Sequence, residues 1–287
     1  MNAFSSQLAA GSAGELVTTA LLLGASLALL IGLSLGLLGG GGSILTVPVL
    51  VYVLGLEPKR AIATSLLVVG GASAVGALAH ARGGRVQWRT GLAFGLAGMA
   101  GAFAGGRLAR FVPAPVLLLG FALIMLVTGM AMLRGRASLA SQASQPGARA
   151  ASAALPLGKV ATLGGLVGLV TGLVGAGGGF VIVPALVLLG GLPVGAAVGT
   201  SLLVITMNSL AAFAGVAGAV PVEWRLGGLM AACAAAGSLL GDRLAGRLPQ
   251  RTLRAAFGCF VIAMALLTLS QQRPLLSTVI QDRHGPA

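Results

Sequence analysis

The sequence GGGGSILTVP at residues 39–48 returns in altered form as GAGGGFVIVP at residues 175–184. Each stretch joins a run of glycines to a short apolar segment that contains a proline, and each follows a longer apolar segment. Consecutive glycines do not hold a regular helix, since each costs about 1 kcal/mol relative to alanine. The two stretches therefore predict a broken helix at matching places in the two halves of the chain.

The composition places these breaks inside a membrane protein. The chain of 287 residues is 57% hydrophobic and only 8% charged, whereas a soluble domain is about 25% charged. Its 18 lysines and arginines give a net charge of +13, but they are scattered between apolar stretches rather than gathered on one polar face. We therefore exclude a soluble enzyme, a disordered tail and a nucleic-acid-binding module, and predict a polytopic all-α protein embedded in the lipid bilayer.

Apolar segments long enough to cross the hydrocarbon core, which takes about 20 residues, recur through the chain. The pattern predicts eight full spans, at residues 16–38, 60–80, 90–108, 115–133, 158–175, 196–218, 226–244 and 252–270, and two short segments, at 44–54 and 180–190. The predicted organisation is an N-terminal tail at 1–15, a first transmembrane repeat at 16–133, a small and polar linker at 134–157, a second repeat at 158–270 and a C-terminal tail at 271–287.

The two halves align without a gap at a shift of 136 positions. Thr64–Val68 recurs identically as Thr200–Val204, and Trp88-Arg89 recurs as Trp224-Arg225. Because a glycine-rich composition does not produce such matches, we predict two homologous repeats of about five helical segments each.

The distribution of lysine and arginine indicates how the repeats are oriented. If all ten segments cross, loops 81–89, 134–159 and 242–254 share one side with 11 of the 18 basic residues, and the repeats are inverted. If the two short segments re-enter instead, there are eight crossings, parallel repeats and a 10 to 8 split of the charge. The charge bias favours the inverted arrangement, with the basic side in the cytoplasm.

The glycine runs are the strongest candidate site. Broken backbone at membrane depth is tolerated only where protein or a water-filled cavity covers it, and a new helix N-terminus attracts anions. Short, glycine-interrupted segments at matching places in two halves also point to the substrate site of a transporter. Close helix packing is the alternative role of glycine, and we favour it for the pairs Gly36 and Gly40, Gly101 and Gly105, and Gly237 and Gly241.

Hydroxyl and amide side chains extend this candidate site. The repeated pair of Thr and Ser at 64–65 and 200–201 can donate to the oxygens of an anion, or it can bond back to its own helix. Asn208 lies on the same helix face as Thr200, where an interhelical hydrogen bond is the alternative. The predicted substrate-binding residues are Gly40, Gly41, Gly42, Ser43, Thr64, Ser65, Gly177, Gly178, Gly179, Thr200, Ser201 and Asn208.

Charged and metal-binding residues are informative by their scarcity. Only five acids occur, none in the middle of a predicted span, and Asp242 can pair with the adjacent Arg243. His80 and His284 stand isolated in the sequence, and the two cysteines form no CxxC pair. We therefore predict no catalytic residues, no metal and no cofactor, and we disfavour a carboxylate proton relay and a cationic substrate.

The doubled order of these motifs resembles the TauE/SafE sulfite exporter family. A glycine-rich break and a proline are followed by Ala61-Ile-Ala-Thr-Ser-Leu66 in one half and by Ala197-Val-Gly-Thr-Ser-Leu202 in the other. The resemblance covers residues 16–270 and implies a prokaryotic inner-membrane transporter of sulfur-containing anions such as sulfite, thiosulfate or sulfonates.

We accordingly expect a secondary transporter that binds a small anion between the repeats and works by alternating access. A carrier or channel for another anion, such as a carboxylate, is the alternative, and a membrane scaffold without transport is a third class. The predicted partners are the anionic substrate and the bilayer, with no nucleic acid.

Overall fold

A computed structural model describes residues 22–133, 157–175, 178–179, 182–183, 186, 192–244, 259 and 261–271. The elements within these residues are helices, and no β-strand occurs among them. The predicted N-terminal tail, nearly all of the predicted linker and C-terminal tail, and most of the short segment at 180–190 lie outside the described residues.

Within the described residues, the helices lie on the predicted apolar segments. In chain order they are a first helix (Leu22–Leu38), α2 (Ser43–Pro48), η1 (Val49–Val53), α3 (Pro58–Arg82), α4 (Trp88–Ala109), α5 (Ala114–Leu133), α7 (Leu157–Val174), α9 (Val194–Val216), α10 (Trp224–Leu244) and a last helix (Val261–Gln271). By length and composition, three helices among the described residues can cross a membrane: Pro58–Arg82, Trp88–Ala109 and Gly195–Val216. The other apolar helices in this part of the chain are shorter.

Glycine and proline set the boundaries of the elements that matter for the site. The first helix ends where Gly39 and Gly40 take positive φ angles of 69° and 136°, which residues with a Cβ rarely adopt. The chain then restarts as α2, whose last residue, Pro48, has no N–H to donate to the carbonyl of residue 44. The backbone continues as the π-helix η1. The predicted helix break is therefore confirmed in the first half.

The directions of the helices follow from which residues touch. Residues that rise in number along α3 meet residues that fall in number along α9, so these two helices are antiparallel. The contacts are Gly70 with Ser209, Gly76 with Leu202, and His80 with Gly199.

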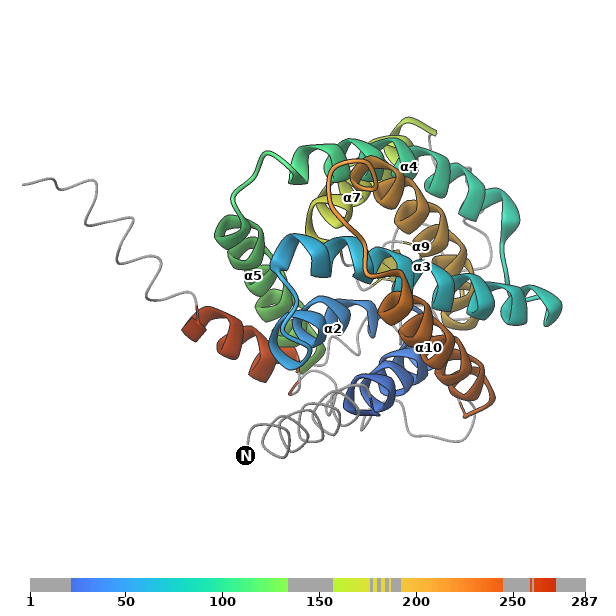
Figure 1. Ribbon diagram of the computed structural model, residues 1–287. Coiled ribbons are helices and arrows are strands. Elements are labelled where there is room, and N and C mark those ends of the chain that lie inside the picture. The colour runs from blue at the N-terminus through green and yellow to red at the C-terminus, as the bar shows by residue number, and fades with distance from the viewer. Residues whose placement is uncertain are drawn as a thin grey trace, which may run out of the picture.

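The other long helices pack in parallel pairs (Figure 1). The first helix runs beside α10 in the same direction, and α10 runs parallel to α3; α7 and α9 both run parallel to α4. The first helix and α3 therefore point the same way, and the chain between them, which contains α2 and η1, must return toward the start of α3.

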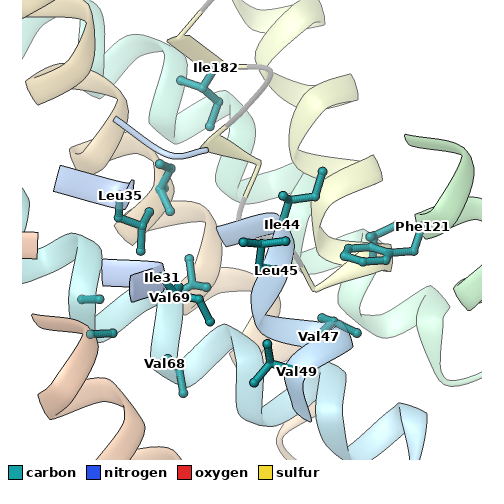
Figure 2. Close-up of a cluster of buried hydrophobic side chains, with 14 of the residues drawn as sticks. Ile31, Leu35, Ile44, Leu45, Val47, Val49, Val68, Val69, Phe121 and Ile182 are labelled. Atoms are coloured by element: carbon teal, nitrogen blue, oxygen red, sulfur yellow. The ribbon is translucent and has the colours of Figure 1, made fainter. Parts of the chain in front are cut away.

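The core lies around the short helix α2, as Figure 2 shows. All six residues of α2 are buried, and Ile44, Leu45 and Val47 meet side chains from the first helix, from α3 and from Phe121 of α5. Many large apolar side chains on the outer faces of the helices are instead exposed, for example Leu96, Leu123 and Leu210 at 58% or more. A core made of the short broken helix and an apolar outer face fit a protein surrounded by lipid.

Candidate functional site

The two glycine breaks are held by a reciprocal pair of hydrogen bonds. The Ser201 hydroxyl of α9 lies 2.5 Å from the Gly39 carbonyl oxygen and 2.7 Å from that of Val198 in its own helix. The Ser65 hydroxyl of α3 lies 2.7 Å from the carbonyl oxygens of both Gly175 and Ile62. The single proton of each hydroxyl is therefore shared between the break of the other half and a bond back to its own helix. Gly39 and Gly175 are 136 positions apart, and so are Ser65 and Ser201. Each half therefore supplies the serine that fixes the break of the other half.

The breaks touch through their backbones, with no room for side chains. A Cβ on Gly40 or on Gly179 would collide with the backbone of the other glycine. Gly39 lies against Val198 and Gly175 against Ile62, which again are matching positions in the two halves. Only glycine fits a crossing of this kind, so a second role for the runs is to let the two breaks meet.

The structure therefore brings together much of the predicted site. Gly40, Ser43, Ser65, Gly179 and Ser201 lie at or beside this crossing and are buried. The Ser43 hydroxyl donates to the Gly40 carbonyl at 2.8 Å.

Four other glycines of the predicted site are placed less centrally or not at all. Gly42 packs on Ile31 of the first helix, and Gly178 packs on Thr171 of α7, so both face their own half. Gly41 is buried in the first break, and Gly177 lies outside the described residues.

The two threonines do not share the surroundings of the serines. Thr64 lies against Gly227 of α10 and Thr200 against Gly91 of α4, so both pack on neighbouring helices. The Thr200 oxygen accepts a hydrogen bond from the backbone N–H of Gln87 at 2.9 Å, whereas the buried Thr64 oxygen has no partner within the described residues.

Asn208 occupies a site of its own. Its side chain is 1% exposed and lies against Gly98 of α4, and neither atom of its amide has a hydrogen-bond partner in the part of the chain that is described. The interhelical hydrogen bond considered for Asn208 is therefore not formed with any described residue. The amide faces α4 and, like the Thr64 hydroxyl, is available for a ligand or water that enters between the helices.

Sequence reasoning missed a cluster of ionisable side chains where α3 and α10 end. The Arg85 guanidinium contacts both oxygens of Asp242, at 2.8 Å and 2.9 Å, so the pairing suggested with Arg243 is wrong. The His80 imidazole lies 3.4 Å from Asp242, so it is not isolated. Parallel packing of α3 and α10 creates this neighbourhood, and the only signal in the sequence is that His80 and Asp242 break the repeat.

A shallow cavity lies near the start of α3. Lys59, Ile62, Arg110 and Val216 are among its lining residues, and the Lys59 ammonium donates to the Arg110 carbonyl at 3.0 Å. Ile62 separates this cavity from the Gly175 break. No three His, Cys, Asp or Glu side chains gather as metal ligands in the described ranges.

Paired glycine breaks inside an apolar helical bundle are typical of membrane transporters with discontinuous helices. Comparison with known proteins gives the family. The sequence profile of the sulfite exporter TauE/SafE family matches residues 24–268, and the chain belongs to this family. Two relatives from Xylella fastidiosa, each called a "Probable membrane transporter protein", are 37% identical (strain 9a5c) and 38% identical (strain Temecula1). Each alignment covers 238 residues, 82% of this chain and 89% of the relative. No solved structure matches the chain.

The predicted resemblance to the TauE/SafE family is thus confirmed, and the protein is a membrane transporter.

Proposed function

We propose that the protein is a secondary transporter for a small sulfur-containing anion, such as sulfite, thiosulfate or an organosulfonate, in the bacterial inner membrane. The observation that carries the proposal is the reciprocal crossing of the two breaks, in which Ser65 holds Gly175 and Ser201 holds Gly39. Broken helices that meet at matching places in two halves are where transporters of several folds bind their substrates. The TauE/SafE profile match supports a sulfur anion as the substrate.

The helix directions support two inverted repeats and ten crossings. α3 and α9 occupy matching places in the two halves and run antiparallel. An axis that exchanges them is therefore perpendicular to both helices, and it lies in the plane of the membrane if they span it. The return of the chain between the first helix and α3 supports a crossing, rather than a re-entrant loop, for the short segment at 44–54.

The chemistry of the crossing suits an oxygen-rich anion. Backbone N–H groups at the start of a helix favour negative charge without a cation or a metal. The hydroxyls of Ser65 and Ser201 already face carbonyls, so their part is to fix the breaks, and the N–H groups of residues 40–42 and 178–179 are the ones that would face the anion. Rocking of one half against the other would release one serine–glycine bond at a time and open the crossing to alternate sides.

The experiment is flux of ³⁵S-labelled sulfite, ³⁵S-labelled thiosulfate and a labelled sulfonate into liposomes that contain purified protein. Gly40→Ala should abolish flux, because a methyl group there meets the Gly179 backbone and the positive φ angle is strained. Gly120→Ala in α5 is the matched control, because nothing lies within 4 Å of its new methyl group.

Saturable flux of one sulfur anion by the wild type and the control, lost in Gly40→Ala, would support the proposal. Folded wild-type protein that carries no sulfur anion would overturn the assignment of the substrate. Flux of a carboxylate without flux of any sulfur anion would show that the alternative is right and that the site binds another class of anion.

A further inference from the structure

His80 and Asp242 face each other at the edge of the bundle, outside the crossing. The His80 side chain is 3% exposed, and its Nε2 lies 3.4 Å from Asp242 Oδ1. Its Nδ1 lies 3.1 Å from the carbonyl oxygen of Gly76, one turn earlier in α3. Both nitrogens of the imidazole therefore face acceptors.

Either neutral tautomer of the ring sets one lone pair against an oxygen atom, and only a doubly protonated ring can donate from both nitrogens. A neutral imidazole carries one N–H and one lone pair, so with Nδ1–H donated to Gly76 the lone pair of Nε2 would point at a carboxylate oxygen. The Asp242 carboxylate is held by Arg85 at 2.8 Å and 2.9 Å, which favours its charged form. An imidazolium would present one N–H to the Gly76 carbonyl and the other to the Asp242 carboxylate.

We propose that His80 and Asp242 form a proton-binding site, and that the bound proton keeps this end of the transporter closed. The inference deepens the proposed function, on which it rests, because it supplies the ion that controls access to the crossing. Loss of the proton removes one donor from this contact and weakens the hold between the ends of α3 and α10.

The cluster packs on the part of α9 that lies against the crossing. The His80 side chain and the Arg85 carbonyl both pack on Gly199 of α9. Gly199 stands between Val198, which covers Gly39, and Thr200, which binds Gln87. Residues 80–87 thus cover the stretch of α9 that holds the first break, and their movement would expose Val198.

The opposite end of the molecule lacks these groups. The positions that match His80, Arg85 and Asp242 are Val216, Pro221 and Gly106. Val216 instead lines the shallow cavity beside Ile62, the residue that matches Val198. One end is therefore covered by a titratable cluster, and the other end carries a cavity.

Charged groups around His80 are few within the described residues. Asp242 faces it from α10 and Arg85 from the loop after α3, whereas α9 presents Gly199, which has no ionisable side chain. Arg82 follows on α3 itself. A pH response of this end can accordingly be assigned to the pair of His80 and Asp242.

The test measures access to Val198 and requires no substrate. Val198→Cys is placed in a chain in which Cys233 and Cys259 are serine, and alkylation by a polar maleimide is followed in purified protein from about pH 5.5 to about pH 8, the range in which histidine titrates. The same cysteine is also placed in a His80→Gln background. The labelling rate of one protein is divided by that of the other at each pH, so that the intrinsic pH dependence of the thiol cancels. Ile62→Cys is the matched control at the end without a histidine.

The His80 protein should be labelled more slowly than the His80→Gln protein at low pH, by roughly 5- to 30-fold, the factor expected for one charge-assisted contact. The two rates should converge at high pH, and Ile62→Cys should be insensitive to His80→Gln. If His80→Gln does not fold, Asp242→Asn should give the same fast labelling. A rate ratio that stays constant with pH, or an equal effect on Ile62→Cys, would overturn the proton site, while a failure of anion flux would leave this result intact.

Discussion

The two halves of the molecule match where backbones touch and differ where charges lie. Gly36 of the first helix packs on Ser238 of α10, and Gly172 of α7 packs on Ala102 of α4. Gly172 matches Gly36 and Ala102 matches Ser238 in the alignment of the two halves, so the same contact occurs twice. Gly105 and Gly241 occupy matching positions and form a second pair of equivalent backbone contacts.

The ion pairs follow no such rule. The cluster around Asp242 has no copy at the other end among the described residues, where Arg60 pairs with Glu223 instead. Close backbone packing leaves no alternative to a small residue in either copy, whereas charged side chains at the ends of inverted repeats meet opposite sides of the membrane and are free to diverge.

The largest effect should come from filling a matched backbone contact. Gly36→Ala and Gly172→Ala should each destabilise the protein by about 1–3 kcal/mol, because the new methyl group meets a carbonyl of the partner helix. The measurement is the thermal midpoint of the detergent-solubilised protein. Gly228→Ala in α10 has open space around it and should not lower the midpoint. Tolerance of one substitution but not of the other would break the equivalence of the halves.

A smaller and equal effect should follow from removing either serine of the crossing. Ser65→Ala and Ser201→Ala each remove a hydroxyl whose proton is shared between a glycine carbonyl of the other half and a carbonyl of its own helix, at a cost of about 1 kcal/mol. The same thermal midpoint reports it. Ser73→Ala is the control, because the buried hydroxyl of Ser73 has no partner in the described part of the chain. A loss for Ser73→Ala as large as that for Ser65→Ala would contradict the assigned role.

The threonines should behave differently from each other. Thr200→Val removes the acceptor of the Gln87 N–H, which should cost about 0.5 kcal/mol because Gln87 lies at an exposed loop. Amide hydrogen exchange at Gln87 should accelerate in this variant. Thr64→Val removes a hydroxyl with no described partner and should leave the stability unchanged. Equal losses would indicate that the two threonines are equivalent after all.

The smallest effect is expected at the exposed pair of Arg60 and Glu223. These side chains are 42% and 49% exposed and lie 3.4 Å apart. Glu223→Gln should change the stability by less than about 0.5 kcal/mol, because water and salt screen such pairs. The difference from the wild type should vanish in high salt. A large effect that persists in high salt would mean that this end is held by charge as firmly as the end with Asp242.

Much of the fold could be predicted from the sequence because helices and their breaks depend on local patterns of apolar residues and glycines. The apolar run at 60–80 became α3, and the run of glycines at 39–42 broke the first helix where consecutive glycines cannot continue one. The matched positions Ser65 and Ser201 stand out in the sequence, but their contact with the opposite break could not be predicted. That bond depends on which helices of the two halves lie side by side, and helix spacing along the chain does not encode it.

The cluster of His80, Arg85 and Asp242 could not be predicted for the same reason. His80 and Asp242 are separated by α4, α5, α7 and α9 in the chain, and only the parallel packing of α3 and α10 joins them. Their departure from the repeat was visible, since Val216 and Gly106 stand at the matching positions. A search for polar residues that break an otherwise faithful repeat would have found them.

The pairing of the first helix with α10 also has a consequence for synthesis. The glycine-lined face of the first helix leaves the ribosome long before its partner, because Leu38 precedes Trp224 by 186 residues. At about 5–20 residues per second, that face waits roughly 10–40 s for the helix that covers it. Neither half can finish its own packing, so we expect the protein to be assembled in the membrane only after its last helices have been inserted, and a truncated chain to be a target for proteolysis.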